Sequence, residues 1–237
     1  MEKTIKVSSR NASLDTSRRN FLKLGGVGIM AAGLTLVGCN DDDFQYIPPT
    51  DVFDLGSGDV GVLNYAYALE QLEADFYTKV VNSFYAGATV MEKEILTDIY
   101  NHEVIHRDFF QAAISGVTGN VLPTLTFKYD GVDFNSRASV LATAKALEDT
   151  GVAAYNGAGK YITNLDYLVI AGKIVSVEAR HASAIRDLIN PGSMDFSGDD
   201  IVDPISGLDV AKEPSAIIAA AGGFITTPFT WKEQGIG

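Results

Sequence analysis

Apolar side chains recur at intervals of three and four residues along four long stretches of the chain, which predicts four amphipathic helices. Leu63, Ala66 and Val80 share one such stripe in the first stretch, and Ile174 and Ile185 share another in the fourth. The periodic stretches cover residues 59–83, 89–115, 136–161 and 164–189. Amphipathic helices of this length favour an all-α fold in which the apolar stripes pack together as a four-helix bundle.

Capping residues and glycines refine the expected helix ends and contacts. Asp59 has the side chain of a helix N-cap, and Gly116 is a residue type that commonly ends a helix. Gly151, Gly157 and Gly159 each weaken the third helix by roughly 1 kcal/mol relative to alanine. We expect these three glycines to allow another helix to approach closely.

A long connection separates the second and third helices, over residues 116–136. Pro123, the alternation of apolar and polar residues over 125–129 and the Asp130-Gly131 pair predict an extended segment with a turn. A crossover of this length is expected when the second and third helices run parallel, because a short loop would make them antiparallel.

The first forty residues have the pattern of an export signal rather than of a folded element. Arg18 and Arg19 lie in Ser-Arg-Arg-Asn-Phe-Leu-Lys, which resembles a twin-arginine signal, although an ordinary Sec-type signal also carries basic residues here. The apolar run that follows, residues 24–37, is shorter than the about 20 residues that a transmembrane helix needs. It ends in Leu-Val-Gly-Cys, which resembles a lipobox and makes Cys39 the expected lipidation site. Because Cys39 is the only cysteine, an intramolecular disulfide is excluded, and a buried thiol is the alternative.

The chain therefore divides into four expected parts. They are a signal peptide over 1–38, an acidic linker over 39–58, the bundle over 59–190 and a C-terminal extension over 191–237. The acidic run at the start of the linker resembles the surface-export tag of some bacterial lipoproteins, with a solvated tether as the alternative. The extension is rich in Gly, Pro and Asp, and we expect it to form an arm, with one short apolar helix, packed on the bundle. The expected location is the cell envelope, where lipidated Cys39 would hold the protein to the periplasmic face, the outer membrane or the cell surface.

The chain is acidic, with a net charge of −12 at pH 7. Removing residues 1–38 takes away six basic and two acidic residues, so the remaining chain carries a charge of −16. Nucleic acid is excluded as an expected partner, because the sequence contains no basic patch that could neutralise phosphates.

Four glutamates and two histidines recur in an internal repeat. Each half contains a single glutamate after Ala-Leu, a tyrosine seven residues later, and then a Glu-x-x-His unit. The members are Glu70, Tyr77, Glu103 and His106 in the first half, and Glu148, Tyr155, Glu178 and His181 in the second. The halves are offset by 78 residues at the single glutamates and by 75 residues at the Glu-x-x-His units.

These residue types at this spacing predict a metal site. Glu and His at positions i and i+3 of a helix project from adjacent turns of one face, which is here the apolar stripe. Isolated carboxylates in a helix core would each cost several kcal/mol in desolvation, a cost that two divalent cations shared by four glutamates can offset. Oxygen-rich ligation suits iron or manganese better than structural zinc. The repeat therefore predicts a dinuclear site and leaves iron and manganese as alternatives.

Other residues close to the repeat are candidates for contacts with the ligands. Glu73 lies on the same stripe as Glu70, so either could be the ligand from the first helix, and the shared spacing to tyrosine favours Glu70. Tyr77 and Tyr155 are candidates for hydrogen bonds to the ligands or for redox relays, with core packing as the alternative. His102 points about 100° away from its neighbouring glutamate on a helix, which favours a surface role.

The pattern resembles the ferritin-like superfamily of di-iron and di-manganese carboxylate proteins. Residues 63–77, Leu-Asn-Tyr-Ala-Tyr-Ala-Leu-Glu-Gln-Leu-Glu-Ala-Asp-Phe-Tyr, resemble the ferritin-like domain family that includes desiccation-related proteins. The resemblance covers roughly residues 59–229 and all six ligand positions. It implies that Glu103 and Glu178 bridge two metals, that Glu70 and Glu148 are terminal ligands, and that each histidine binds one metal.

The resemblance and the export signal together imply an exported protein whose metals react with a small oxidant. Ferrous oxidation, peroxide removal and a manganese-catalase-like reaction are the expected chemistries, with stress protection as the purpose. The alternative is a non-enzymatic envelope scaffold of the stress or desiccation type, with a structural or vestigial metal site. Iron storage in a cage is not favoured, because a closed shell would have to accommodate the lipid anchor, the tether and the arm. The oligomeric state stays open.

Overall fold

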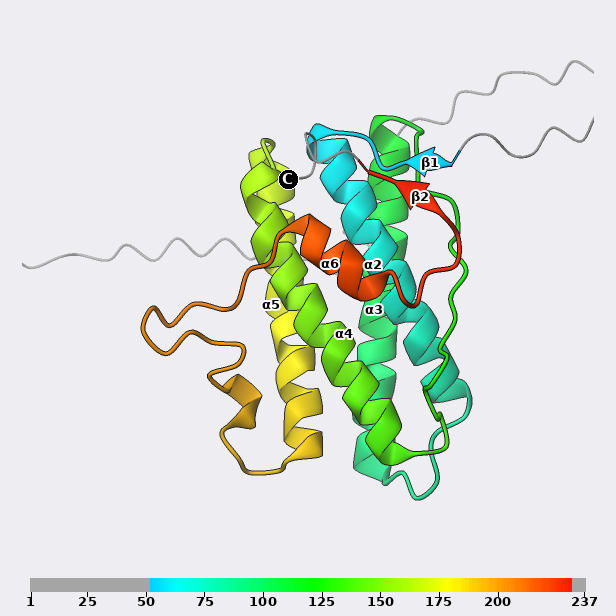
Figure 1. Cartoon of the computed structure of the whole chain (residues 1–237), viewed down its shortest axis with the longest axis vertical. Helices are drawn as coiled ribbons and strands as arrows, with labels where there is room; N and C mark the ends of the chain where they lie inside the picture. The colour runs from blue at the N-terminus through cyan, green and yellow to red at the C-terminus, as the bar shows by residue number, and fades with distance from the viewer. Residues whose placement is uncertain (1–51, 232–237) are drawn as a thin grey trace, which may run out of the picture. The chain divides into compact units, whose positions relative to one another are not determined.

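Four long helices make up most of the computed structural model, which describes residues 52–231 (Figure 1). The helices are α2 (Gly58–Asn82), α3 (Val90–Val117), α4 (Arg137–Ala158) and α5 (Leu165–Ile189). All four predicted helices are present, and the prediction of an all-α bundle is confirmed. The expected signal peptide, Cys39 and most of the expected linker lie outside the described residues.

The helices pack as two pairs that face each other. The pair α2 and α3 lies along the pair α4 and α5, with further contacts from α2 to α4 and from α3 to α5. Figure 1 shows the connection between α3 and α4 running back along the bundle, so that these two helices point in the same direction. The predicted crossover is therefore confirmed. Within residues 52–231, no helix is both long and apolar enough to cross a membrane.

Two polar side chains of α2 hold the crossover against the bundle. The Asn64 amide donates to the backbone carbonyls of Leu55 and Asn120 and accepts from the Leu122 N–H. Gln71, two turns further along, accepts from the Leu125 N–H at 2.8 Å. Buried polar groups are tolerated when they are hydrogen-bonded in this way. The crossover covers the outer face of α2, and this helix is buried on nearly every side as a result.

The chain ends of the described region meet beside the bundle. Strand β1 (Phe53–Asp54) pairs in parallel with β2 (Phe229–Thr230). Leu55, directly after β1, is fully buried. The expected linker therefore ends earlier than residue 58, because apolar residues before the first helix pack onto the domain.

The predicted C-terminal arm contains two short helical elements, the 3-10 helix η2 (Asp195–Ser197) and the helix α6 (Pro214–Ala221). A further 3-10 helix, η1 (Gly159–Tyr161), directly follows α4. Helix α6 packs on α4, and the arm hydrogen-bonds α4 through the Lys212 N–H and the Ala153 carbonyl at 3.0 Å. A side chain on Gly157 would place its Cβ 1.7 Å from the Lys212 carbonyl oxygen. The missing side chain of Gly157 thus leaves room for the backbone of the arm. The sequence analysis expected this glycine to allow another helix to approach.

Two expected helix ends were wrong. Ser57, not Asp59, occupies the N-cap position of α2. The Asp59 carboxylate instead accepts hydrogen bonds from Thr163 and from the Asn164 N–H, so it fastens the loop between α4 and α5 to α2. Helix α3 continues through Gly116 to Val117, and the positive φ of +69° that follows a helix end is at Gly119.

Candidate metal centre

All six predicted ligand residues converge in the centre of the bundle. Helix α2 contributes Glu70, α3 contributes Glu103 and His106, α4 contributes Glu148, and α5 contributes Glu178 and His181. The four glutamate side chains are fully buried, and the two imidazoles are nearly so. Helical periodicity turns each of them toward the core, because each lies on the apolar stripe of its helix.

The six residues form two overlapping groups. Glu70 and His106 belong to the first group, and Glu148 and His181 belong to the second. Glu103 and Glu178 belong to both, and the ligand atoms within each group lie within 4.8 Å of one another. Carboxylates shared by two such groups have the placement expected of bridging ligands.

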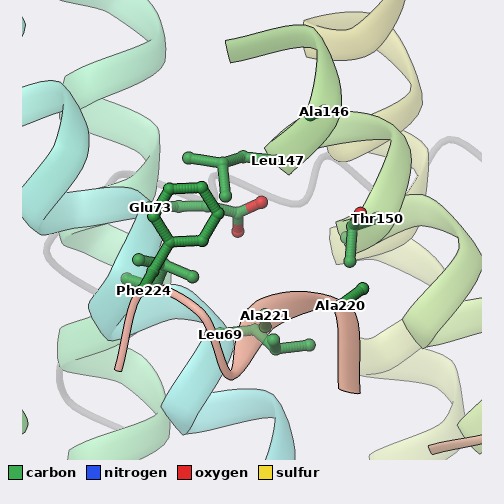
Figure 2. A pocket seen from close by; sticks show the side chains of 10 residues that line it. Leu69, Glu73, Ala146, Leu147, Thr150, Ala220, Ala221 and Phe224 are labelled. Atoms are coloured by element: carbon green, nitrogen blue, oxygen red, sulfur yellow. The ribbon is translucent and has the colours of Figure 1, made fainter. Parts of the chain in front are cut away.

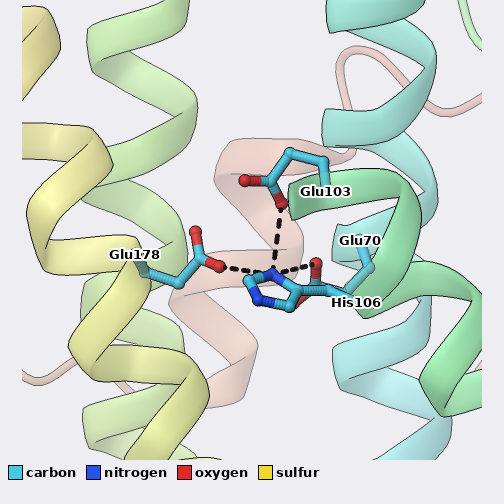
Figure 3. Close-up of side chains that lie close together, drawn as sticks. All are labelled: Glu70, Glu103, His106 and Glu178. Carbon is cyan, nitrogen blue, oxygen red and sulfur yellow. Dashed lines mark ion pairs between the residues drawn. The ribbon is translucent and has the colours of Figure 1, made fainter. Parts of the chain in front are cut away.

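Each imidazole presents its Nδ1 atom to three carboxylates. Figure 3 shows the first group, in which His106 Nδ1 lies 2.9 Å from Glu178, 3.4 Å from Glu70 and 3.6 Å from Glu103. In the second group, His181 Nδ1 lies 2.7 Å from Glu103 Oε1 and 3.6 Å from Glu178 Oε2. The two groups are therefore related in the same way as the two halves of the repeat.

The arrangement of the ligand atoms is better suited to binding metal ions than to hydrogen bonds between the side chains. Although they approach closely enough to be ion pairs, the facing atoms do not reach hydrogen-bonding geometry and are left buried without a hydrogen-bond partner among the described residues. They are Nδ1 of His106 and His181, both carboxylate oxygens of Glu103 and Glu178, and Oε2 of Glu70 and Glu148. Buried polar atoms without a partner are rare in proteins and point to an ion or water. Four carboxylates and two imidazoles are a donor set that suits divalent transition metals.

The charges in the cluster cannot all be present without such ions. Burial, together with the charge of Glu178, raises the pKa of Glu103 to about 8. Glu178 is equally buried, but its contacts with His106 and His181 outweigh the burial and hold its pKa at about 2. Protons therefore occupy part of the cluster in the metal-free protein. Metal binding would displace these protons, since only the ionised carboxylate and the neutral imidazole are good ligands.

The two repeat tyrosines hydrogen-bond to ligands of the opposite half. The Tyr77 hydroxyl donates to Glu148 Oε1 at 2.5 Å, and the Tyr155 hydroxyl donates to Glu70 Oε1. In Glu148 and Glu70, the other carboxylate oxygen, Oε2, makes no hydrogen bond and faces the imidazole of its own ligand group. The tyrosine that lies seven residues after each single glutamate therefore hydrogen-bonds to the single glutamate of the other half, which stands on a different helix.

Glu73 is close to the centre but belongs to neither ligand group. Its side chain is buried, and its Oε1 atom lies 3.0 Å from the position that a Cβ on Gly151 would occupy. Of the two glutamates, only Glu70 lies in a group of side chains that could hold a metal ion among the described residues, and its role as the ligand of α2 stays a prediction. Glu73 fits where it does because the facing residue of α4 has no side chain.

The sequence interpretation missed one contact of the ligand cluster, made by His102. Its side chain is exposed, as expected, yet its Nδ1 lies 2.9 Å from Nε2 of His181 and the two rings stack with an interplanar angle of 8°. If Nδ1 of His181 binds a metal, its Nε2 carries the proton and can donate to His102. Helix geometry showed that His102 points away from Glu103, but only the packing of α3 on α5 brings it to His181.

Comparison with known proteins gives the family. No curated protein matches the chain. The model of a family described as the ferritin-like domain matches residues 58–191, which is more than half of the chain and includes all six ligand-type residues. Since the helical bundle and the buried glutamate and histidine cluster agree with this match, the chain belongs to the ferritin-like domain family.

Proposed function

We propose that this protein holds two iron or manganese ions in the bundle and uses them to reduce dioxygen or peroxide. The observation that carries the proposal is the pair of overlapping ligand groups, which share Glu103 and Glu178. A single structural ion would need only one such group. Two groups that share two carboxylates provide the ligands for a pair of ions that act on one oxidant.

Held by Glu70, Glu103, His106, Glu148, Glu178 and His181, two such ions would supply the two electrons that reduce peroxide, a reaction that takes up two protons and yields two water molecules. The protein residues would hold and insulate this centre. The Tyr77 and Tyr155 hydroxyls keep Glu148 and Glu70 in position for binding. The closed packing around the fully buried glutamates excludes bulk water, which strengthens the electrostatic contacts between ligands and ions.

We further propose that the protein is exported and anchored by a lipid. Arg18, Arg19 and Cys39 support this part of the proposal through the signal that they resemble. The twin-arginine route carries folded proteins, so the metal centre could be assembled in the cytoplasm before export. Fractionation of cells that express Cys39→Ser is the test. We expect this variant to leave the membrane fraction, and retention there would contradict the lipid anchor.

Metal analysis of protein expressed with its own signal tests the central proposal. We expect at least about one iron or manganese per chain, and a large loss of metal in Glu103→Gln and Glu178→Gln, because each removes a charged ligand shared by both groups. A lower metal content, or one that neither substitution changes, would overturn the proposal. If the stress phenotype survives in a folded Glu103→Ala and Glu178→Ala double variant, the non-enzymatic scaffold is the better interpretation.

A further inference from the structure

A second feature of the bundle is a small, mostly apolar cavity between α2, α4 and α6 (Figure 2). About 130 Å³ of it is open to molecules of the size of water, several times the ~10–15 Å³ that one water molecule requires. Leu69, Leu147 and Phe224 form apolar walls, and Ala220 of α6 lies at the rim and is exposed. The arm that packs on the bundle therefore forms one side of the cavity.

The inner wall of the cavity carries a carboxyl group. Glu73 lines the cavity with only 3% of its surface exposed, and Figure 2 shows its carboxyl turned into the space. Among residues 52–231 it has no hydrogen-bond or ion-pair partner, unlike the ligand Glu70 one turn before it. The Thr150 side chain also lines the cavity and adds a hydroxyl. A buried carboxyl that faces a cavity and lacks a partner is suited to binding a small hydrogen-bonding molecule.

Gly151 joins this cavity to the ligand cluster. It lines the cavity, and the place of its missing side chain lies 3.0 Å from Glu73 Oε1 and 3.7 Å from Glu178 Oε2. Gly151 follows Glu148 by three residues, as Glu73 follows Glu70, so the repeat carries a carboxyl in one half and no side chain in the other. Because Gly151 has no side chain, no Cβ stands between Glu73 in the cavity and Glu178, one of the shared ligands.

We propose that hydrogen peroxide reaches the metal centre through this cavity, with Glu73 and Thr150 as its hydrogen-bonding groups and Gly151 as the passage. The inference rests on the proposed function and deepens it by choosing between the two oxidants. The apolar walls disfavour hydrated ions, so the molecule is small and uncharged. The two polar groups favour peroxide over dioxygen, because peroxide both donates and accepts hydrogen bonds whereas dioxygen gains little from them.

Closing the rim tests the route without touching the ligands. In Ala220→Trp a large ring replaces a methyl group at the rim, and in the control Ala219→Trp the same ring stands on a neighbouring exposed residue that does not line the cavity. Both variants are loaded with ferrous iron, analysed for metal and mixed with hydrogen peroxide in a single turnover. We expect equal metal contents and a rate about tenfold lower in Ala220→Trp alone, equivalent to ~1.4 kcal/mol on the barrier. Xenon binding to the metal-free proteins should likewise be lost only in Ala220→Trp.

A second pair of variants tests the choice of peroxide. Glu73→Leu removes the hydrogen-bonding group and Glu73→Gln keeps one of similar shape. We expect Glu73→Leu to lower the peroxide rate relative to the dioxygen rate and Glu73→Gln to restore that ratio.

The outcomes separate the two proposals. A chain that binds no metal overturns the proposed function and this route together. A metal-loaded chain whose Ala220→Trp and Ala219→Trp variants react equally fast overturns only the route. An unchanged ratio of peroxide and dioxygen rates in Glu73→Leu overturns the role of peroxide.

Discussion

Replacing Gly157 with alanine should detach part of the C-terminal arm from the bundle. The new Cβ would lie 1.7 Å from the Lys212 carbonyl oxygen, 2.6 Å from its carbonyl carbon and 3.0 Å from its nitrogen. All three atoms are backbone, so no side chain can rotate away to relieve the clash. The arm must retreat, and the hydrogen bond from the Lys212 N–H to the Ala153 carbonyl is lost as it does so.

The magnitude follows from three contributions. Forcing a methyl group into closely packed surroundings costs about 1–3 kcal/mol, and the lost hydrogen bond costs about 1 kcal/mol. The higher helix propensity of alanine returns up to about 1 kcal/mol. The Gly157→Ala variant should therefore be less stable by about 1–3 kcal/mol, and at about 2–4 °C per kcal/mol its unfolding midpoint should fall by several degrees.

Gly172→Ala is the matched control for this experiment. Gly172 also lies inside a long helix, α5, but a Cβ there would meet no atom within 4 Å. Alanine should therefore stabilise the protein at this position by up to about 1 kcal/mol. Thermal unfolding of both variants, with limited proteolysis of the arm, makes the comparison. If Gly157→Ala is as stable as Gly172→Ala and its arm is equally resistant to protease, the close contact between α4 and the arm does not exist.

Three further predictions concern the cluster and the helix ends. Tyr155→Phe removes the hydrogen bond to Glu70 and should weaken metal binding about 10–100-fold, measured by competition with a chelator; an unchanged affinity would show that the hydroxyl does not orient the ligand. Although burial opposes its ionisation, the Thr89 N–H and the Arg137 guanidinium lower the pKa of Glu92 to about 2, so its contribution to stability is present above pH 4.5 and lost as the pH falls toward 2. Glu92→Gln should therefore cost about 1–2 kcal/mol at pH 7, a figure reduced because the guanidinium is partly exposed, and should flatten the loss of stability in acid. Because the pKa of Glu103 is about 8, metal binding at pH 7 should release protons, and the metal affinity should increase as the pH rises. Titration calorimetry in buffers of different ionisation enthalpy measures the proton release. A binding heat that does not depend on the buffer would contradict this prediction.

The sequence by itself determined the helices and the ligand-type residues of the site. Side-chain direction on a helix follows from local geometry, so the spacing from Glu103 to His106 was enough to place both on one inward face. Helix geometry left Glu70 and Glu73 as alternatives on one stripe, and the spacing of seven residues to a tyrosine, shared by both halves of the repeat, favoured Glu70. These features depend only on residues a few positions apart in the same helix.

Only the tertiary structure decided which side chains of different helices contact one another. The bond from Tyr155 to Glu70 joins residues 85 positions apart, and the contact between His102 and His181 spans 79. Asp59 resembled a cap in the sequence, yet its carboxylate binds a loop that follows α4. Gly151 was recognisable as a weak helix residue, but its use as room for Glu73 depends on how closely α2 and α4 pack. Local periodicity fixes the face that a residue occupies, whereas the partner on that face is fixed by the packing energy of the whole bundle.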